Sequence, residues 1–347
     1  MRVPRQPARA GAVTLASIAD RAGVHLSTVS RALSPEPAGV GPAMVERIRA
    51  IADELGYRRD AAAYTLRTGH SRLIGVLVPR LTDVALATIY DAIDRTAALA
   101  GYNTVVANTR DDAELRRSRL DLLLSRRVDG VILGDSRAAS NPIPELRRAG
   151  VPFVLVMRRL PRQISVTTDD VAGGRLAARH LLELGHERVG VIAGDPGTST
   201  GAERTQGFRD AYAEAGSPIP DEYVVESDFH VDGGRRAAER LLTLPVQPSA
   251  VFAINDFTAI GAMGAIRDAG LRVGTDVAVV GFNDLDLAAQ LPVGLTSVRS
   301  PLAEMGELSV RMLLDLLEGR KVRSRRLPPV LVERASTLDS RRSPVIR

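Results

Sequence analysis

The stretch TLASIADRAGVHLSTVSRAL, residues 14–33, holds two helical patterns that meet at a glycine. The apolar residues of the first pattern follow the i, i+3, i+4, i+7 spacing of one helix face: Leu15, Ile18, Ala19 and Ala22. Thr14 precedes this pattern as a favourable N-cap, and Gly23 follows it. The sequence therefore predicts a helix from Leu15 that ends at a tight turn.

The second pattern has one apolar and one polar face. Its apolar face carries Val29, Ala32 and Leu33, and its free face carries Leu26, Ser27 and Arg31. A third helical pattern starts near Pro42 and stops at Gly56. Three short helices with a glycine turn between the first two are typical of a helix-turn-helix, whose second helix enters the major groove of DNA. The free face then meets base edges and phosphates, and a merely solvated face is the alternative.

The net charge of +5 is placed unevenly along the chain. Residues 1–72 carry 11 Arg and six Asp or Glu, whereas residues 73–347 carry equal numbers of basic and acidic residues. This excess of positive charge indicates a small polyanion-binding module joined to a neutral body. A basic, solvated tail is the alternative interpretation.

Length, composition and the absence of certain motifs favour a cytoplasmic, multidomain protein over secreted, membrane-spanning or enzymatic classes. A chain of 347 residues predicts two or three domains, and the absence of Cys fits a reducing cytoplasm. The first residues lack the apolar segment of a signal peptide, and no apolar run is long enough to span a membrane. The five His are scattered, and no GxSxG or HExxH motif occurs. We therefore expect a cytoplasmic protein with no metal, cofactor or catalytic residue.

After residue 72 the pattern changes to short apolar runs that alternate with helical stretches. The runs are LIGVLV from Leu73, NTVVAN from Asn103, DGVIL from Asp129, PFVLVM from Pro152, RVGVIA from Arg188, AVFAI from Ala250 and VAVVGF from Val277. Helices are predicted at 113–127, 173–184 and 257–269. This alternation predicts parallel sheets covered by helices on both faces. The length accommodates two such units, with a ligand between them beyond the strands' carboxyl ends.

Motifs from Val13 to about Thr337 resemble those of one family. They are TLASIADRAGV, STVSRAL, ELGY, TLRTGHSRLIGVLVP, RRVDGVIL, HLLELGHERVGVIAG, ERTQGF, AVFAINDFTAIGAMGAIRDAG and VAVVGFNDLDLA. On these motifs the chain resembles the lactose-repressor (LacI/GalR) family of bacterial transcription regulators. The resemblance implies an α/β fold with a helix-turn-helix head and a periplasmic-binding-protein-like effector domain of two parallel-sheet subdomains. It also implies a homodimer on a pseudo-palindromic operator in double-stranded DNA.

The resemblance assigns DNA contacts to two segments. In the head, the base-reading positions fall on Leu26, Ser27 and Arg31, and the further contacts on Thr14, Thr28 and Ser30. In the hinge segment, Leu66 matches a wedge into the minor groove, with Ala63 and Arg67 beside it. The chain departs from the family at Arg59, Asp60 and Tyr64, and at His25, where the family commonly has a Ser cap. His25 is expected to cap the helix less well.

The resemblance also implies a ligand-binding cleft. Its predicted residues are Asp83, Leu86, Met157, Arg204, Phe229, Asn255 and Asp284. Arg, Asn and Asp side chains can bind adjacent hydroxyls, which favours a sugar. Met157 replaces a common cleft Asp, and Ala85 and Leu86 replace an aromatic pair. A hexose is the first expectation, and a nucleoside or a less polar metabolite stays open; for Arg204, a structural ion pair is the alternative.

These expectations combine into one domain plan. Residues 1–12 form a disordered arm, 13–58 the DNA-binding head and 59–72 the hinge. Residues 73–340 form the ligand-binding and dimerisation domain, with an N-subdomain at about 73–170 and 301–329 and a C-subdomain at about 171–300 and 330–340. The expected function is a ligand-controlled regulator, a repressor rather than an activator. The alternative is a cytosolic sugar-binding receptor or sugar-modifying protein with a vestigial head.

Overall fold

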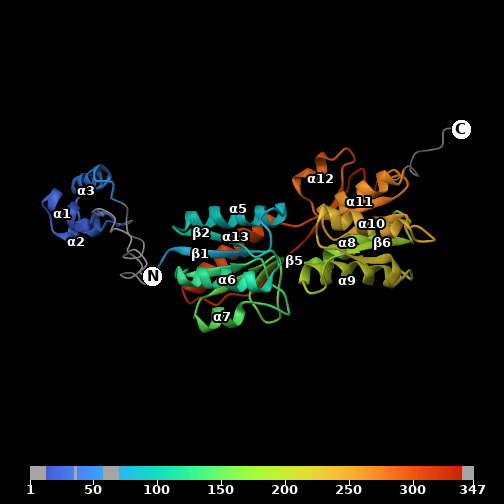
Figure 1. The fold of residues 1–347 in the computed structure, drawn as a ribbon, viewed down its shortest axis with the longest axis horizontal. Coiled ribbons are helices and arrows are strands. Elements are labelled where there is room, and N and C mark those ends of the chain that lie inside the picture. Colours follow the sequence, from blue (N-terminus) through green and yellow to red (C-terminus); the bar gives the residue numbers. More distant parts are fainter. Residues whose placement is uncertain (1–12, 35–36, 58–69, 338–347) are drawn as a thin grey trace, which may run out of the picture. The chain divides into compact units, whose positions relative to one another are not determined.

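The computed structural model describes residues 13–34, 37–57 and 70–337. The chain divides into two compact units at Ser71 and Arg72. The described helices of the first unit are α1 (Leu15–Ala22), α2 (Leu26–Ala32) and α3 (Pro42–Glu54). Figure 1 shows them as a small helical cluster.

The first unit packs around a small apolar core. Ile18, Val29 and Ile48 come from the three different helices and are all fully buried. A capping box between Thr14 and Ser17 starts α1. Gly23 ends that helix in the left-handed conformation, with φ of 67°, which glycine adopts without steric cost. The three predicted helices and their glycine turn are confirmed.

The second unit contains two sheets, and the part built on the first is called the N-subdomain. Its strand order is β11-β5-β4-β3-β1-β2, and all neighbours are parallel. The strands are β1 (Leu73–Val78), β2 (Asn103–Asn108), β3 (Gly130–Leu133), β4 (Phe153–Val156), β5 (Ser165–Thr168) and β11 (Arg325–Leu327). One face packs on α5 (Val84–Leu99) and α13 (Leu302–Leu317), and the other on α6 (Ala113–Ser125) and α7 (Ile143–Arg148) (Figure 1).

The part built on the second sheet is called the C-subdomain. Its strand order is β12-β10-β9-β8-β6-β7, and β12 alone runs antiparallel to its neighbour. The strands are β6 (Val189–Ala193), β7 (Val224–Glu226), β8 (Ala250–Ala253), β9 (Ala278–Asn283), β10 (Thr296–Arg299) and β12 (Val330–Val332). The helices are α8 (Asp170–Glu183), α9 (Ser199–Glu214), α10 (Val231–Leu242), α11 (Asp256–Asp268) and the short α12 (Asp286–Gln290), with a 3₁₀ turn at Asp221–Tyr223. Pairs α8/α9 and α10/α11 cover opposite faces (Figure 1).

Glycines let the helices of each pair approach closely. A Cβ atom added to Gly174 of α8 would lie 2.2 Å from the carbonyl oxygen of Arg204 in α9. A Cβ atom added to Gly261 of α11 would lie 1.9 Å from the carbonyl oxygen of Val231 in α10. The helix backbones are therefore in direct contact in both pairs, which fixes the distance between α8 and α9.

The chain passes between the subdomains after β5, after β10 and after β11. The predicted α/β class with parallel sheets is confirmed. All seven predicted apolar runs contain strands, whereas β5, β7, β10, β11 and β12 were not predicted. In the described parts of the chain, no helix combines the length and apolar character that a membrane span requires.

Candidate functional site

The first candidate site is the outer face of α2. Leu26 is 46% exposed, and Ser27 and Arg31 are exposed beside it. The Arg31 Nε atom donates to the Ser27 carbonyl oxygen at 3.2 Å, which lays the guanidinium along the helix surface. Thr28 and Ser30 are half-buried. The structure thus brings an apolar, a hydroxyl and a cationic side chain onto one solvent-facing patch.

Two capping residues flank this patch. Thr14 is exposed at the start of α1 and caps that helix. His25 caps α2, since its Nδ1 atom accepts the Ser27 backbone N–H at 3.3 Å and lies 2.8 Å from the Ser27 hydroxyl. The imidazole therefore fills the cap position and also holds a predicted base-reading hydroxyl. The hinge residues Ala63, Leu66 and Arg67, and the arm at 1–12, lie outside the described residues.

The second candidate site is a pocket in the second unit, where the carboxyl ends of strands from both sheets meet. Its lining residues follow β1, β2, β4, β6, β7, β8 and the end of β9: Pro79, Arg80, Asp83, Leu86, Asp111, Met157, Arg158, Thr200, Arg204, Asp228, Phe229, His230, Asn255 and Asn283. Six of the seven residues predicted for the cleft are among them. This position is the expected one for a ligand in open α/β sheets.

Asp284 is the predicted cleft residue that the structure does not bring to this pocket. Its carboxylate is bound by Arg334 Nη1 at 2.6 Å and by Arg299 Nε at 2.8 Å. Asn283 lines the pocket in its place. Both residues have positive φ, 103° for Asn283 and 53° for Asp284, so the backbone turns sharply here and sends the neighbouring side chains in different directions.

Arg204 reaches the pocket from α9 while fully buried. Its Nε atom donates to Asp170 at 2.7 Å, and its Nη1 atom donates to the Ile254 carbonyl oxygen at 3.0 Å. The guanidinium carbon also lies 3.8 Å from the centre of the Phe282 ring. Burial raises the pKa of Asp170 to about 6, against the opposing charge of Arg204. Arg204 is therefore both a pocket residue and half of a structural ion pair.

Two other predicted residues have their polar atoms engaged within the fold. Asp83 caps α5, accepting the Ala85 N–H at 2.9 Å, and burial raises its pKa. Asn255 caps α11 through the Thr258 N–H at 2.9 Å and donates its amide to the Phe229 carbonyl oxygen at 3.0 Å. Phe229 has a φ of 65°, so Asn255 stabilises a strained loop whose ring lines the pocket.

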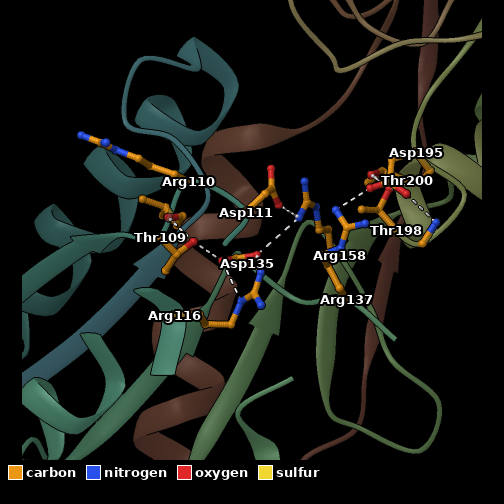
Figure 2. Close-up of polar contacts among 12 residues, drawn as sticks. Thr109, Arg110, Asp111, Arg116, Asp135, Arg137, Arg158, Asp195, Thr198 and Thr200 are labelled. Carbon is orange, nitrogen blue, oxygen red and sulfur yellow. Dashed lines mark hydrogen bonds and ion pairs between the residues drawn. The ribbon is translucent and has the colours of Figure 1, made fainter. Parts of the chain in front are cut away.

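Arg158 belongs to a buried charge network that was not predicted. Figure 2 shows its guanidinium between Asp111 and Asp135, at 2.7 Å and 3.5 Å respectively. Arg116 binds both oxygens of Asp135 at 2.8 Å, and Thr109 also donates to this carboxylate. Burial would raise the pKa of Asp111, but the adjacent Arg158 outweighs it and lowers that pKa. The network fixes one wall of the pocket.

Contacts between the subdomains continue from this wall. Figure 2 shows Arg137 of the N-subdomain paired with Asp195 of the C-subdomain. Arg159 Nε lies 2.6 Å from Glu203, and the Arg159 backbone N–H donates to the Ser199 hydroxyl at 2.9 Å. Polar contacts therefore bridge the two subdomains beside the pocket.

Sequence reasoning missed several pocket residues: Arg80, Asp111, Arg158, Thr200, His230 and Asn283. Position was a usable signal for five of them, because Arg80, Asp111, Arg158, Thr200 and Asn283 follow a predicted apolar run or lie in the loop after it. His230 follows β7, which was not predicted. Thr200, in the GDPGTSTG loop at residues 194–201, is one of these pocket residues. In the part of the chain that the structure describes, no cluster of three His, Cys, Asp or Glu side chains could hold a metal ion.

The buried Asp256 beneath the pocket gives the domain a specific pH dependence. Burial raises its pKa to about 7 from 3.8, although Ser297 and the Leu285 N–H donate to it. The folded state therefore holds this proton more tightly than the unfolded chain does. As a result, the free energy of unfolding falls as pH rises from 3.8, the ordinary pKa of the group, to about 7, its pKa in the fold. In this pH range we expect the free energy of unfolding of the wild type to fall by up to about 1.4 kcal/mol per pH unit more than that of Asp256→Asn. Urea unfolding at several pH values measures this, and parallel curves would contradict it.

Comparisons with known proteins match both units. Residues 14–60 match the family described as bacterial regulatory proteins, lacI family, and residues 178–337 match a periplasmic binding protein-like domain. The ribose operon repressor of Escherichia coli (strain K12) is 32% identical over 330 residues, covering 93% of this chain and 99% of the repressor. The HTH-type transcriptional repressor PurR of Serratia proteamaculans is 31% identical over 332 residues, covering 94% and 97%.

Solved structures give the same result. The lac repressor dimer bound to operator and the anti-inducer ONPF is 29% identical, with a TM-score of 0.84 over 94% of this chain and 100% of that chain. A LacI family regulator from Enterococcus faecium with bound ribose is 28% identical, with a TM-score of 0.68 over 76% of this chain and 98% of that chain. The arrangement of elements in this chain is thus that of operator-binding and sugar-binding proteins.

Proposed function

Because the chain belongs to the LacI family of bacterial regulatory proteins, we propose that it is a DNA-binding transcriptional repressor controlled by a small-molecule effector. It binds its operator as a homodimer, as the lac repressor does in its operator complex. The observation that carries the proposal is the pairing, in one chain, of an exposed α2 face with a pocket between two subdomains. The protein acts in the cytoplasm, at the nucleoid.

For DNA recognition, we propose that α2 lies in the major groove of each half-site. Leu26, Ser27 and Arg31 meet base edges, and an Arg can bind guanine through two hydrogen bonds. Thr14, Thr28 and Ser30 position the head on the backbone. Leu66 is the minor-groove wedge, with Ala63 and Arg67 beside it.

For control, we propose that the effector binds Asp83, Leu86, Met157, Arg204, Phe229 and Asn255, with Asn283 in place of Asp284. An effector that contacts both subdomains favours the arrangement in which they are held together, which pairs such as Arg137 with Asp195 also stabilise. Closure moves the N-subdomains of the dimer relative to each other and thereby controls the hinge segments. The relatives are repressors rather than enzymes. We therefore propose that the pocket binds its ligand without chemistry.

Selection of operator DNA from random duplexes by the purified full-length protein tests this function. We expect a pseudo-palindromic site for the wild type, at a stated near-physiological salt concentration because affinity depends steeply on salt. Arg31→Ala should lower affinity by about 1–3 kcal/mol and relax the sequence at the matching half-site positions. Arg49→Ala removes an equal charge from an exposed site on α3 and should leave the selected sequence unchanged. No enriched site at all would favour a cytosolic receptor with a vestigial head.

A further inference from the structure

We infer that the effector is an anionic sugar, whose carboxylate or phosphate group is bound on the side of the pocket formed by Arg80 and Arg158. This inference rests on the proposed function, because it concerns the ligand of the same pocket. A sugar acid and a sugar phosphate share the chemistry that the pocket requires, which is a hydroxylated body with a negatively charged end.

The carboxylates that line the pocket are already committed to partners within the fold. Asp111 binds Arg158 at 2.7 Å. Asp228 is 3.3 Å from Arg236 and also accepts the His230 N–H at 3.2 Å. Asp83 accepts the Ala85 N–H, and burial disfavours its charged form. Each of these carboxylates therefore has at least one oxygen bound to a group of the fold.

The uncommitted polar groups are mainly cationic or able to donate. Among the residues the structure describes, the half-buried Arg80 has no ion-pair or hydrogen-bond partner for its guanidinium. Arg158 is 7% exposed, and its contacts to Asp111 and Asp135 use the Nη1 atom, which leaves Nε and Nη2 available. The buried Nε2 atom of His230 has no hydrogen-bond partner in the described structure. Such groups are most favourably satisfied by an acceptor with negative charge.

A charge balance of the pocket leads to the same ligand class. Arg204 is neutralised by Asp170, and Arg116 and Arg158 together are balanced by Asp111 and Asp135. Arg236 balances Asp228. Arg80 has no ion-pair partner among the residues that the structure describes. A pocket with an unpaired guanidinium and unpaired N–H donors matches an anion.

The apolar part of the lining suits the body of the same ligand. Phe229, Met157 and Leu86 provide a ring, a thioether and an aliphatic surface. Met157 stands where a carboxylate of the cleft was expected from the resemblance, so this pocket lacks an acceptor for two adjacent hydroxyls at that point. The carbon skeleton of a sugar can pack on these groups while its charged end faces the guanidinium groups.

Calorimetry on the full-length protein tests the inference with two matched pairs of probes. The first pair is D-glucuronate and D-glucose, and the second is D-ribose 5-phosphate and D-ribose. We expect the wild type to bind an anionic member at least about 10-fold more tightly than its neutral partner, a difference of about 1.4 kcal/mol. The member that binds distinguishes a sugar acid from a sugar phosphate.

Arg80→Gln is the decisive variant because Arg80 has no structural partner to lose, whereas an Arg158 variant would disturb the buried network. This change should reduce the preference for the anion about 10-fold or abolish it. Arg110→Gln removes an exposed arginine near the same loop that does not line the pocket, and should leave the preference unchanged. Equal or tighter binding of a neutral sugar, a preference that survives Arg80→Gln, or failure of all four probes to bind would overturn the inference. Operator selection with the same preparation shows separately whether the proposed function stands.

Discussion

Arg116→Ala is expected to destabilise the effector unit by about 3–5 kcal/mol, because it leaves a buried carboxylate without its main counter-charge. Arg116 is 2% exposed and Asp135 is fully buried, and two N–H groups of the arginine bind the two oxygens of that carboxylate at 2.8 Å. Arg116 Nη1 also donates to the carbonyl oxygen and the hydroxyl of Ser140, both at 3.0 Å. The loss is a large fraction of the stability of an ordinary domain, which is about 5–15 kcal/mol.

The measurement is equilibrium unfolding in urea, with Arg117→Ala as the matched control. Arg117 is the next residue of α6, is exposed, and should change the free energy of unfolding by less than about 0.5 kcal/mol. Since Arg158 contacts Asp135 in the same network, Arg116→Ala should also weaken ligand binding in the folded protein. Equal free energies of unfolding for the two variants would show that the buried Arg116–Asp135 pair does not stabilise the effector unit.

Gly261→Ala is expected to destabilise the C-subdomain by about 3 kcal/mol through overpacking. The new methyl group would lie 1.9 Å from the Val231 carbonyl oxygen and 2.6 Å from the Arg235 backbone nitrogen. Both obstacles are backbone atoms, so α10 and α11 must separate to accommodate it. Asn255 at the start of α11 would move with the helix, which also predicts weaker ligand binding.

Gly264→Ala in the same helix is the matched control for Gly261→Ala. A Cβ atom there meets only the Arg235 Nη1 atom, at 3.7 Å, within 4 Å. Replacement of an interior helical glycine by alanine should therefore stabilise the unit by about 0.5–1 kcal/mol. Thermal and urea unfolding measure the change in the free energy of unfolding for each variant. The two changes have opposite signs if α10 and α11 approach closely at Gly261, and the same sign if they do not.

How far the fold was predictable depended on the strength of each local pattern. Runs such as LIGVLV and NTVVAN coincide with β1 and β2, because a strand buried between helices is almost wholly apolar. The missed β5 reads SVTT and β11 reads RRL, so neither shows apolar continuity or clear alternation. These short strands are specified by pairing with β4 and with each other, which is tertiary information.

The resemblance assigned Arg204 and Asn255 to the cleft through the ERTQGF and FAIND motifs, and both line the pocket. The site was not predictable at Asn283 and Asp284, because the choice between two adjacent polar residues depends on a turn with positive φ at both. Arg158 was missed for a related reason: its role follows from Asp111 and Asp135, which come from loops after two other strands. Charge networks of this kind become visible only when the topology is known.

If the pocket is the effector site, its occupancy changes the affinity of the protein for its operator. The most direct measurement is the Kd for the selected operator by fluorescence anisotropy, at fixed salt, with and without a compound whose binding calorimetry has established. We predict a change of about 5-fold or more, corresponding to a coupling free energy of about 1–3 kcal/mol, and its loss in Arg204→Met. An unchanged operator Kd at saturating ligand would contradict the claim, because it would show that the pocket and the DNA-binding head are not coupled.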